Sequence, residues 1–102
     1  MSFSGGSYEE VARWLRNFLT SHAKRVDPRI EVELDAEDER DGKSYGARLR
    51  LGDRLTETIE LDFREVADSR GSLAWCAARA ELIRGRARAL LAERGALDAP
   101  AR

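Results

Sequence analysis

The sequence has little of the residue types that staple small folds or carry metal and redox chemistry. It contains one cysteine, Cys76, and one histidine, His22, in 102 residues. An intramolecular disulfide and the usual zinc sets are therefore excluded. No run approaches the roughly 18–20 consecutive apolar residues of a membrane span, and the first residues lack the apolar run of a signal peptide. We expect a cytoplasmic protein with no membrane contact, no metal and no cofactor.

Net charge is also nearly absent, because 18 basic side chains face 19 acidic ones. This balance removes the simplest argument for nucleic-acid binding. The charge is nevertheless uneven: residues 1–26 carry +2, residues 27–63 carry −6 and residues 64–102 carry +3. The pattern indicates a dipolar molecule, whose acidic middle can meet the basic ends of a second copy.

Apolar residues make up 42% of the chain, enough to fill one core at this length. We expect a single domain over residues 7–94, between a flexible N-terminus (1–6) and a flexible C-terminal tail (95–102). A capping box of Ser7 and Glu10 predicts a helix over residues 8–25, which Asp27 and Pro28 end. A second helix, rich in strong helix formers, is predicted over residues 73–93, with Gly95 as its stop signal.

Between these helices the apolar residues alternate with polar ones, as in half-buried strands. The alternation predicts strands over residues 30–36, 44–51 and 59–63, with residues 64–72 as a short connection. Short turns join them, so the strands should pair as an antiparallel meander. The predicted fold is α+β, of order α-β-β-β-α, with a three-stranded antiparallel sheet covered on one face by two helices.

Charged side chains occupy the other face of the predicted sheet. Arg48 and Arg50 on the middle strand lie between an acidic row at residues 31–35 and a second row at residues 58–62. Ion pairs are then available on both sides, each worth roughly 0.2–1 kcal/mol. The alternative is that this acidic face binds a basic partner.

Candidate catalytic residues are few. His22 falls on the core-facing stripe of the first helix, and no nucleophile motif accompanies it. Leu73 and Cys76 fall on the core-facing stripe of the last helix, where a thiol acts as a small hydrophobe. The glycines form no phosphate-binding motif. We therefore expect no enzymatic activity.

Arginines of the last helix provide one alternative function, nucleic-acid binding. They are Arg79, Arg84, Arg86 and Arg88, and their spacing does not place all four on one face. The element order is similar to that of double-stranded RNA-binding domains and of a small dimeric type of bacterial nucleoid-associated protein, which implies nucleic-acid contact. However, residues 68–72 lack a lysine-rich motif, and the acidic loop over residues 37–41 would repel phosphate.

The preferred function is a non-catalytic bacterial interaction module that self-associates. Trp75, Ala78 and Leu82 follow one another at helical spacing, away from the core-facing stripe, and Trp14 of the first helix extends the patch. A homodimer through the helices is the commonest way to cover such a patch, although another protein partner would also serve. The alternative is that Trp75 belongs to the core of its own chain.

Overall fold

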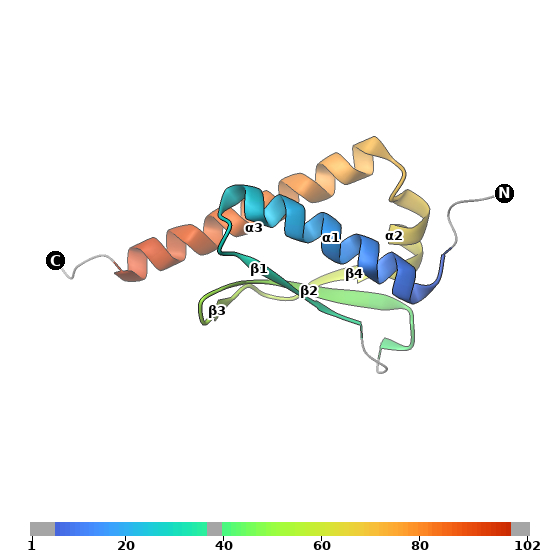
Figure 1. Cartoon of the computed structure of the whole chain (residues 1–102), viewed down its shortest axis with the longest axis horizontal. Helices are drawn as coiled ribbons and strands as arrows, with labels where there is room; N and C mark the ends of the chain where they lie inside the picture. The colour runs from blue at the N-terminus through green and yellow to red at the C-terminus, as the bar shows by residue number, and fades with distance from the viewer. Residues whose placement is uncertain (1–5, 37–39, 99–102) are drawn as a thin grey trace.

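The computed structural model describes residues 6–36 and 40–98, which form two layers (Figure 1). An antiparallel sheet makes one layer, and the helices cover one of its faces. The α+β fold and the order α-β-β-β-α are confirmed, with one short strand and one short helix in addition. None of the helices in the described residues is long and apolar enough to cross a membrane. The elements are α1 (Tyr8–Val26), β1 (Glu31–Asp35), β2 (Ser44–Leu51), β3 (Arg54–Leu55), β4 (Ile59–Asp62), α2 (Phe63–Ser69) and α3 (Leu73–Asp98).

Helix α1 begins and ends at the signals that the sequence carries. The Ser7 side chain accepts a hydrogen bond from the Glu10 backbone N–H at 3.0 Å, and the Glu10 carboxylate accepts one from the Ser7 N–H at 3.1 Å. The helix ends at Val26, where Asp27 takes an extended conformation and its N–H donates to the Ala23 carbonyl. The predicted capping box is thus confirmed, and it fixes where α1 starts above the sheet.

Strand β2 is the centre of the sheet. It pairs antiparallel with β1 on one side and with both β3 and β4 on the other, as a meander in chain order. Its inward side chains are all buried. They are Tyr45, Ala47, Leu49 and Leu51.

The core lies between this face of the sheet and the helices. Leu15 and Leu19 of α1 and Ile83 of α3 are almost fully buried in it. At one end the Tyr45 ring stacks on Tyr8 at a centroid separation of 4.5 Å, and the Tyr45 hydroxyl donates to the Tyr8 carbonyl at 2.8 Å. This burial raises the pKa of Tyr45.

Three expectations for the C-terminal half are wrong. Residues 63–69 form helix α2 rather than strand end and connection, because the Asp62 carboxylate caps a new helix by accepting from the Glu65 N–H at 2.9 Å. Leu73, expected in the core, is 87% exposed, because it opens the first turn of α3. Helix α3 also passes through Gly95 and reaches Asp98.

On the outer face of the sheet, among residues 6–36 and 40–98, the ion pairs predicted for Arg48 and Arg50 form with β1 and not with β4. Arg50 and Arg48 stand opposite Glu31 and Glu33 in register, with side-chain separations of 2.6 Å and 3.4 Å. On the β4 side the expected pairing is wrong. Arg40, in the turn before β2, replaces the β2 arginines there and lies 2.7 Å from a Glu60 carboxylate oxygen.

Candidate interaction surface

Four ring side chains gather where α1 meets α3. Trp14 stacks on Phe18 with ring centroids 5.0 Å apart, and Trp75 lies 6.4 Å from each of them. His22 packs edge-on against Phe18 at 4.8 Å. All four are partly buried. Trp75 therefore packs within its own chain while part of its surface stays accessible.

Trp75 is oriented by polar contacts from two helices. Its indole N–H donates to a Glu65 carboxylate oxygen of α2 at 2.9 Å. The Arg79 guanidinium lies 5.7 Å from the centre of the ring, a cation–π contact worth about 0.5–1 kcal/mol at an exposed site. Helix α2, which was not predicted from the sequence, thus orients Trp75, one of the residues predicted to form the interface.

The other nominated residues have different surroundings. Ala78 is exposed and Leu82 is partly buried. Ala78 belongs to a longer run of exposed residues at helical spacing, which we call the outer α3 face. Leu73, with its 87% exposure, lies at the N-terminal end of this face. The members of the outer α3 face are Leu73, Ala74, Ala77, Ala78, Glu81, Gly85, Arg88 and Ala92.

A chain of polar contacts runs along one side of the outer α3 face. Arg84 donates to Glu81 at 2.9 Å and lies 3.2 Å from the Nδ1 atom of His22. Because a guanidinium only donates, this contact is a hydrogen bond when Nδ1 accepts, as it can in a neutral histidine. Burial, together with the charges of Arg25 and Arg84, lowers the pKa of His22. Arg88 also reaches Glu81, at 3.4 Å.

The four arginines of the nucleic-acid alternative are not brought to one surface. Arg84 and Arg88 share Glu81, which reduces the positive charge that they present. Arg79 lies over Trp75. Arg86 lines a hollow on the side of α3 that faces β3. Phosphate contacts along a nucleic acid need several basic groups on one surface, and these four arginines do not form such a surface.

Cys76 and His22 lie in different surroundings. The Cys76 thiol is partly buried and donates to the Arg70 carbonyl at 3.4 Å. His22 contacts a ring and a guanidinium, as described above. Over residues 6–36 and 40–98 no three histidine, cysteine or carboxylate side chains are grouped as metal ligands would be.

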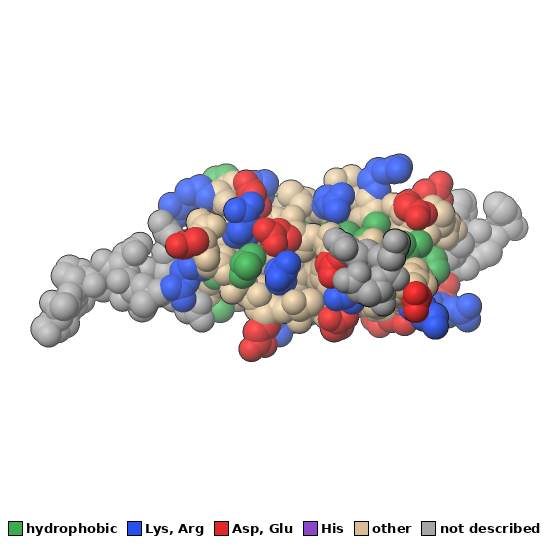
Figure 2. All heavy atoms as spheres, turned by 90° about the horizontal axis from the view of Figure 1, so that it is seen from below, with side chains coloured by type: hydrophobic (Ala, Val, Ile, Leu, Met, Phe, Trp, Pro, Cys, Tyr) green, Lys and Arg blue, Asp and Glu red, His purple; other side chains and the backbone are tan. Residues whose placement is uncertain are grey.

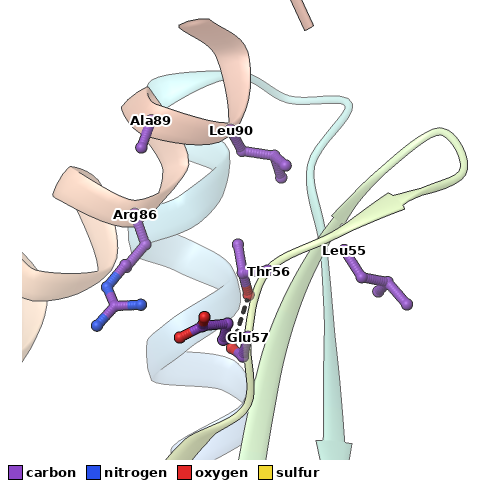
Figure 3. A pocket seen from close by; sticks show the side chains of 6 residues that line it. All are labelled: Leu55, Thr56, Glu57, Arg86, Ala89 and Leu90. Carbon is purple, nitrogen blue, oxygen red and sulfur yellow. Dashed lines mark hydrogen bonds between the residues drawn. The ribbon is translucent and has the colours of Figure 1, made fainter. Parts of the chain in front are cut away.

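Figure 3 shows the hollow between α3 and the segment after β3. Its volume is ≈ 230 Å³, below the roughly 300–1,000 Å³ of most ligand pockets. The Thr56 hydroxyl in its wall already donates to the Glu57 carbonyl and accepts from the Leu49 N–H. A second hollow, of ≈ 280 Å³, lies beside α1 near Tyr8 and Arg13. Both hollows are thus smaller than most ligand pockets.

Arg40 is the residue on the sheet face that sequence reasoning missed. Its guanidinium lies over Gly46 of β2, where a Cβ atom would clash with it and approach the Thr58 methyl group to 2.9 Å. From there it contacts Asp35 at 3.3 Å and Glu60 at 2.7 Å, and it donates to the Ser44 hydroxyl. A glycine inside a central strand is a signal of such a close approach.

The two broad faces of the molecule therefore differ in chemistry. Figure 2 shows the sheet face, where acidic and basic side chains are interspersed and several pair with each other. Half of the outer α3 face is alanine, and it carries one acidic and one basic residue. Comparison with protein-family models, curated proteins and solved structures finds no match to this chain.

Proposed function

We propose that this protein is a non-catalytic interaction module that self-associates through its helices. The observation that carries the proposal is the outer α3 face, an exposed and largely uncharged helix surface ending in the 87% exposed Leu73. A contiguous exposed surface with few charges marks a partner surface more often than isolated exposed apolar residues do. The partly exposed rings of Trp14 and Trp75 lie 6.4 Å apart in the same helical layer and offer further apolar surface to a partner.

The sheet face does not compete for this role. Three of its arginines form ion pairs within the chain. The pairs are Arg50 with Glu31, Arg48 with Glu33 and Arg40 with Glu60. A partner that covered these ion pairs would have to remove their water without offering better partners, which costs free energy. On the outer α3 face the printed ion pairs are confined to Glu81, which pairs with Arg84 and Arg88.

The surroundings of the two reactive side chains support a non-catalytic role. A nucleophilic cysteine needs a neighbouring base or cation, and a catalytic histidine needs an orienting carboxylate or carbonyl. Among the described residues, the Cys76 thiol contacts a backbone carbonyl, and His22 contacts Phe18 and Arg84. Both side chains thus act as packing groups.

Analytical ultracentrifugation at micromolar concentration tests the proposal. We expect the protein to sediment as a dimer, and Ala78→Arg to shift it toward monomer because a charge enters the outer α3 face. The matched control is Thr58→Arg, which adds the same side chain at an exposed position on the sheet face and should leave the dimer intact. A wild-type protein that remains monomeric would refute self-association.

A further inference from the structure

Gly85 lies near the middle of α3, where glycine is a poor choice. It lowers helix stability by about 0.8–1.0 kcal/mol relative to alanine. Packing in the described part of the chain does not require it, because Gly85 is exposed and a Cβ atom built there would meet no atom within 4 Å beyond the neighbouring backbone of its own helix. A glycine on an exposed helix surface is suited to the close approach of another backbone.

The residues on either side of Gly85 are arranged with matching spacing. Ala78 and Ala92 each lie seven residues away, in opposite directions along the helix. Glu81 precedes Gly85 by four residues, and Arg88 follows it by three. The outer α3 face is therefore acidic one turn before the glycine and basic one turn after it.

We propose that α3 of a second copy packs antiparallel on this face, with the two helices crossing at Gly85 and related by a two-fold axis. The inference rests on the proposed self-association and names its geometry. The two-fold axis places Ala78 level with Ala92 of the second copy. It also places Glu81 beside Arg88 of the second copy, and the symmetry forms the same pair twice.

The dimensions of a helix fit this arrangement. At a rise of about 1.5 Å per residue, Glu81 lies roughly 6 Å before the crossing point and Arg88 of the second copy roughly 4.5 Å from it on the same side. The offset of about 1.5 Å is within the reach of an arginine side chain. Small residues at the contact permit a separation near the lower end of the usual 8–10 Å between helix axes.

Charge distinguishes this arrangement from a parallel one. In a parallel pair in register, Glu81 would face Glu81 of the second copy and Arg88 would face Arg88, so both contacts would repel. In the antiparallel pair both contacts attract. Within one chain Arg84 lies 2.9 Å from Glu81, whereas Arg88 lies at the longer distance of 3.4 Å with an exposed side chain.

Charge reversal provides the test, because the two positions complement each other between chains. Glu81→Arg alone brings like charges together at both contacts, and Arg88→Glu alone does the same with the opposite sign. We expect each variant to raise the Kd of self-association at least about tenfold, since each has two repulsive contacts in place of two attractive ones. A mixture of the two variants restores both pairs, so it should form heterodimers, and the double variant should again form homodimers.

Native mass spectrometry of the separate variants and of their mixture reads out these species, and circular dichroism confirms that each variant is folded. If wild type dimerises and both single variants dimerise equally well, self-association stands and the antiparallel contact is overturned. The same holds if the single variants are monomeric and their mixture forms no heterodimer. A monomeric wild type would overturn both proposals.

Discussion

Replacing Gly85 by alanine should stabilise the folded monomer. The added Cβ meets no atom within 4 Å, so packing opposes nothing and the gain in helix propensity of about 0.8–1.0 kcal/mol is retained. For a chain of this length, 1 kcal/mol corresponds to a rise of roughly 4–8 °C in Tm. A shift near the lower end of that range is expected, because the chain has 102 residues.

Thermal unfolding followed by far-ultraviolet circular dichroism measures this shift. The measurement belongs at the lowest workable concentration, where the monomer dominates, and should then be repeated at higher concentration. If two helices cross at Gly85, the added methyl group opposes their approach, so the gain in Tm should shrink as the dimer forms. An unchanged or lower Tm at low concentration would refute the assignment of Gly85 to an open helix surface.

Two further predictions concern the sheet face and the α1–α3 contact. Gly46→Ala should destabilise the fold by displacing Arg40. The loss in the free energy of unfolding should therefore be smaller by about 0.5–1 kcal/mol when Arg40 has already been replaced by alanine. Urea unfolding of the double-mutant cycle measures this coupling, and additive effects would contradict the contact. Burial lowers the pKa of His22, so as the pH falls the unfolded chain binds a proton at this residue before the folded chain does. The contribution of His22 to the free energy of unfolding should therefore be complete above the ordinary pKa of 6.5 and decline as the pH falls below it. His22→Gln should remove this part of the pH dependence, and an identical pH profile for the variant would show that His22 does not contribute.

The parts of the fold that sequence predicted are those set by local signals. The capping box of Ser7 and Glu10 and the alternation of β2 follow from spacing along the chain. That the β2 arginines meet the acidic row of β1 follows from the pairing of neighbouring strands. Helix α2 was missed because strand alternation continues through Phe63. Phe63 fits both the strand alternation before it and the helix after it, and the strand pattern was the longer of the two. Asp62 followed by Glu65 was nevertheless a usable capping signal for a helix.

The candidate surface was harder to predict, because it depends on how helices cross. Periodicity placed Trp75 off the core-facing stripe of its helix, yet its burial depends on where Trp14 of α1 and Glu65 of α2 lie in space. Leu73 fits the core-facing spacing, but it opens the first turn of α3 and stays exposed. Arg40 was missed because its partners Asp35 and Glu60 come from two different strands.

The position of Arg40 also bears on the order in which the sheet can form. The residue belongs to the turn between β1 and β2, yet its shortest ion pair is to Glu60 on β4, twenty residues further along the chain. The turn therefore acquires its final contacts only after β4 has paired with β2. Within the β1–β2 pair Arg40 can contact only Asp35 and Ser44, so β4 contributes the last of the three side chains that hold the guanidinium.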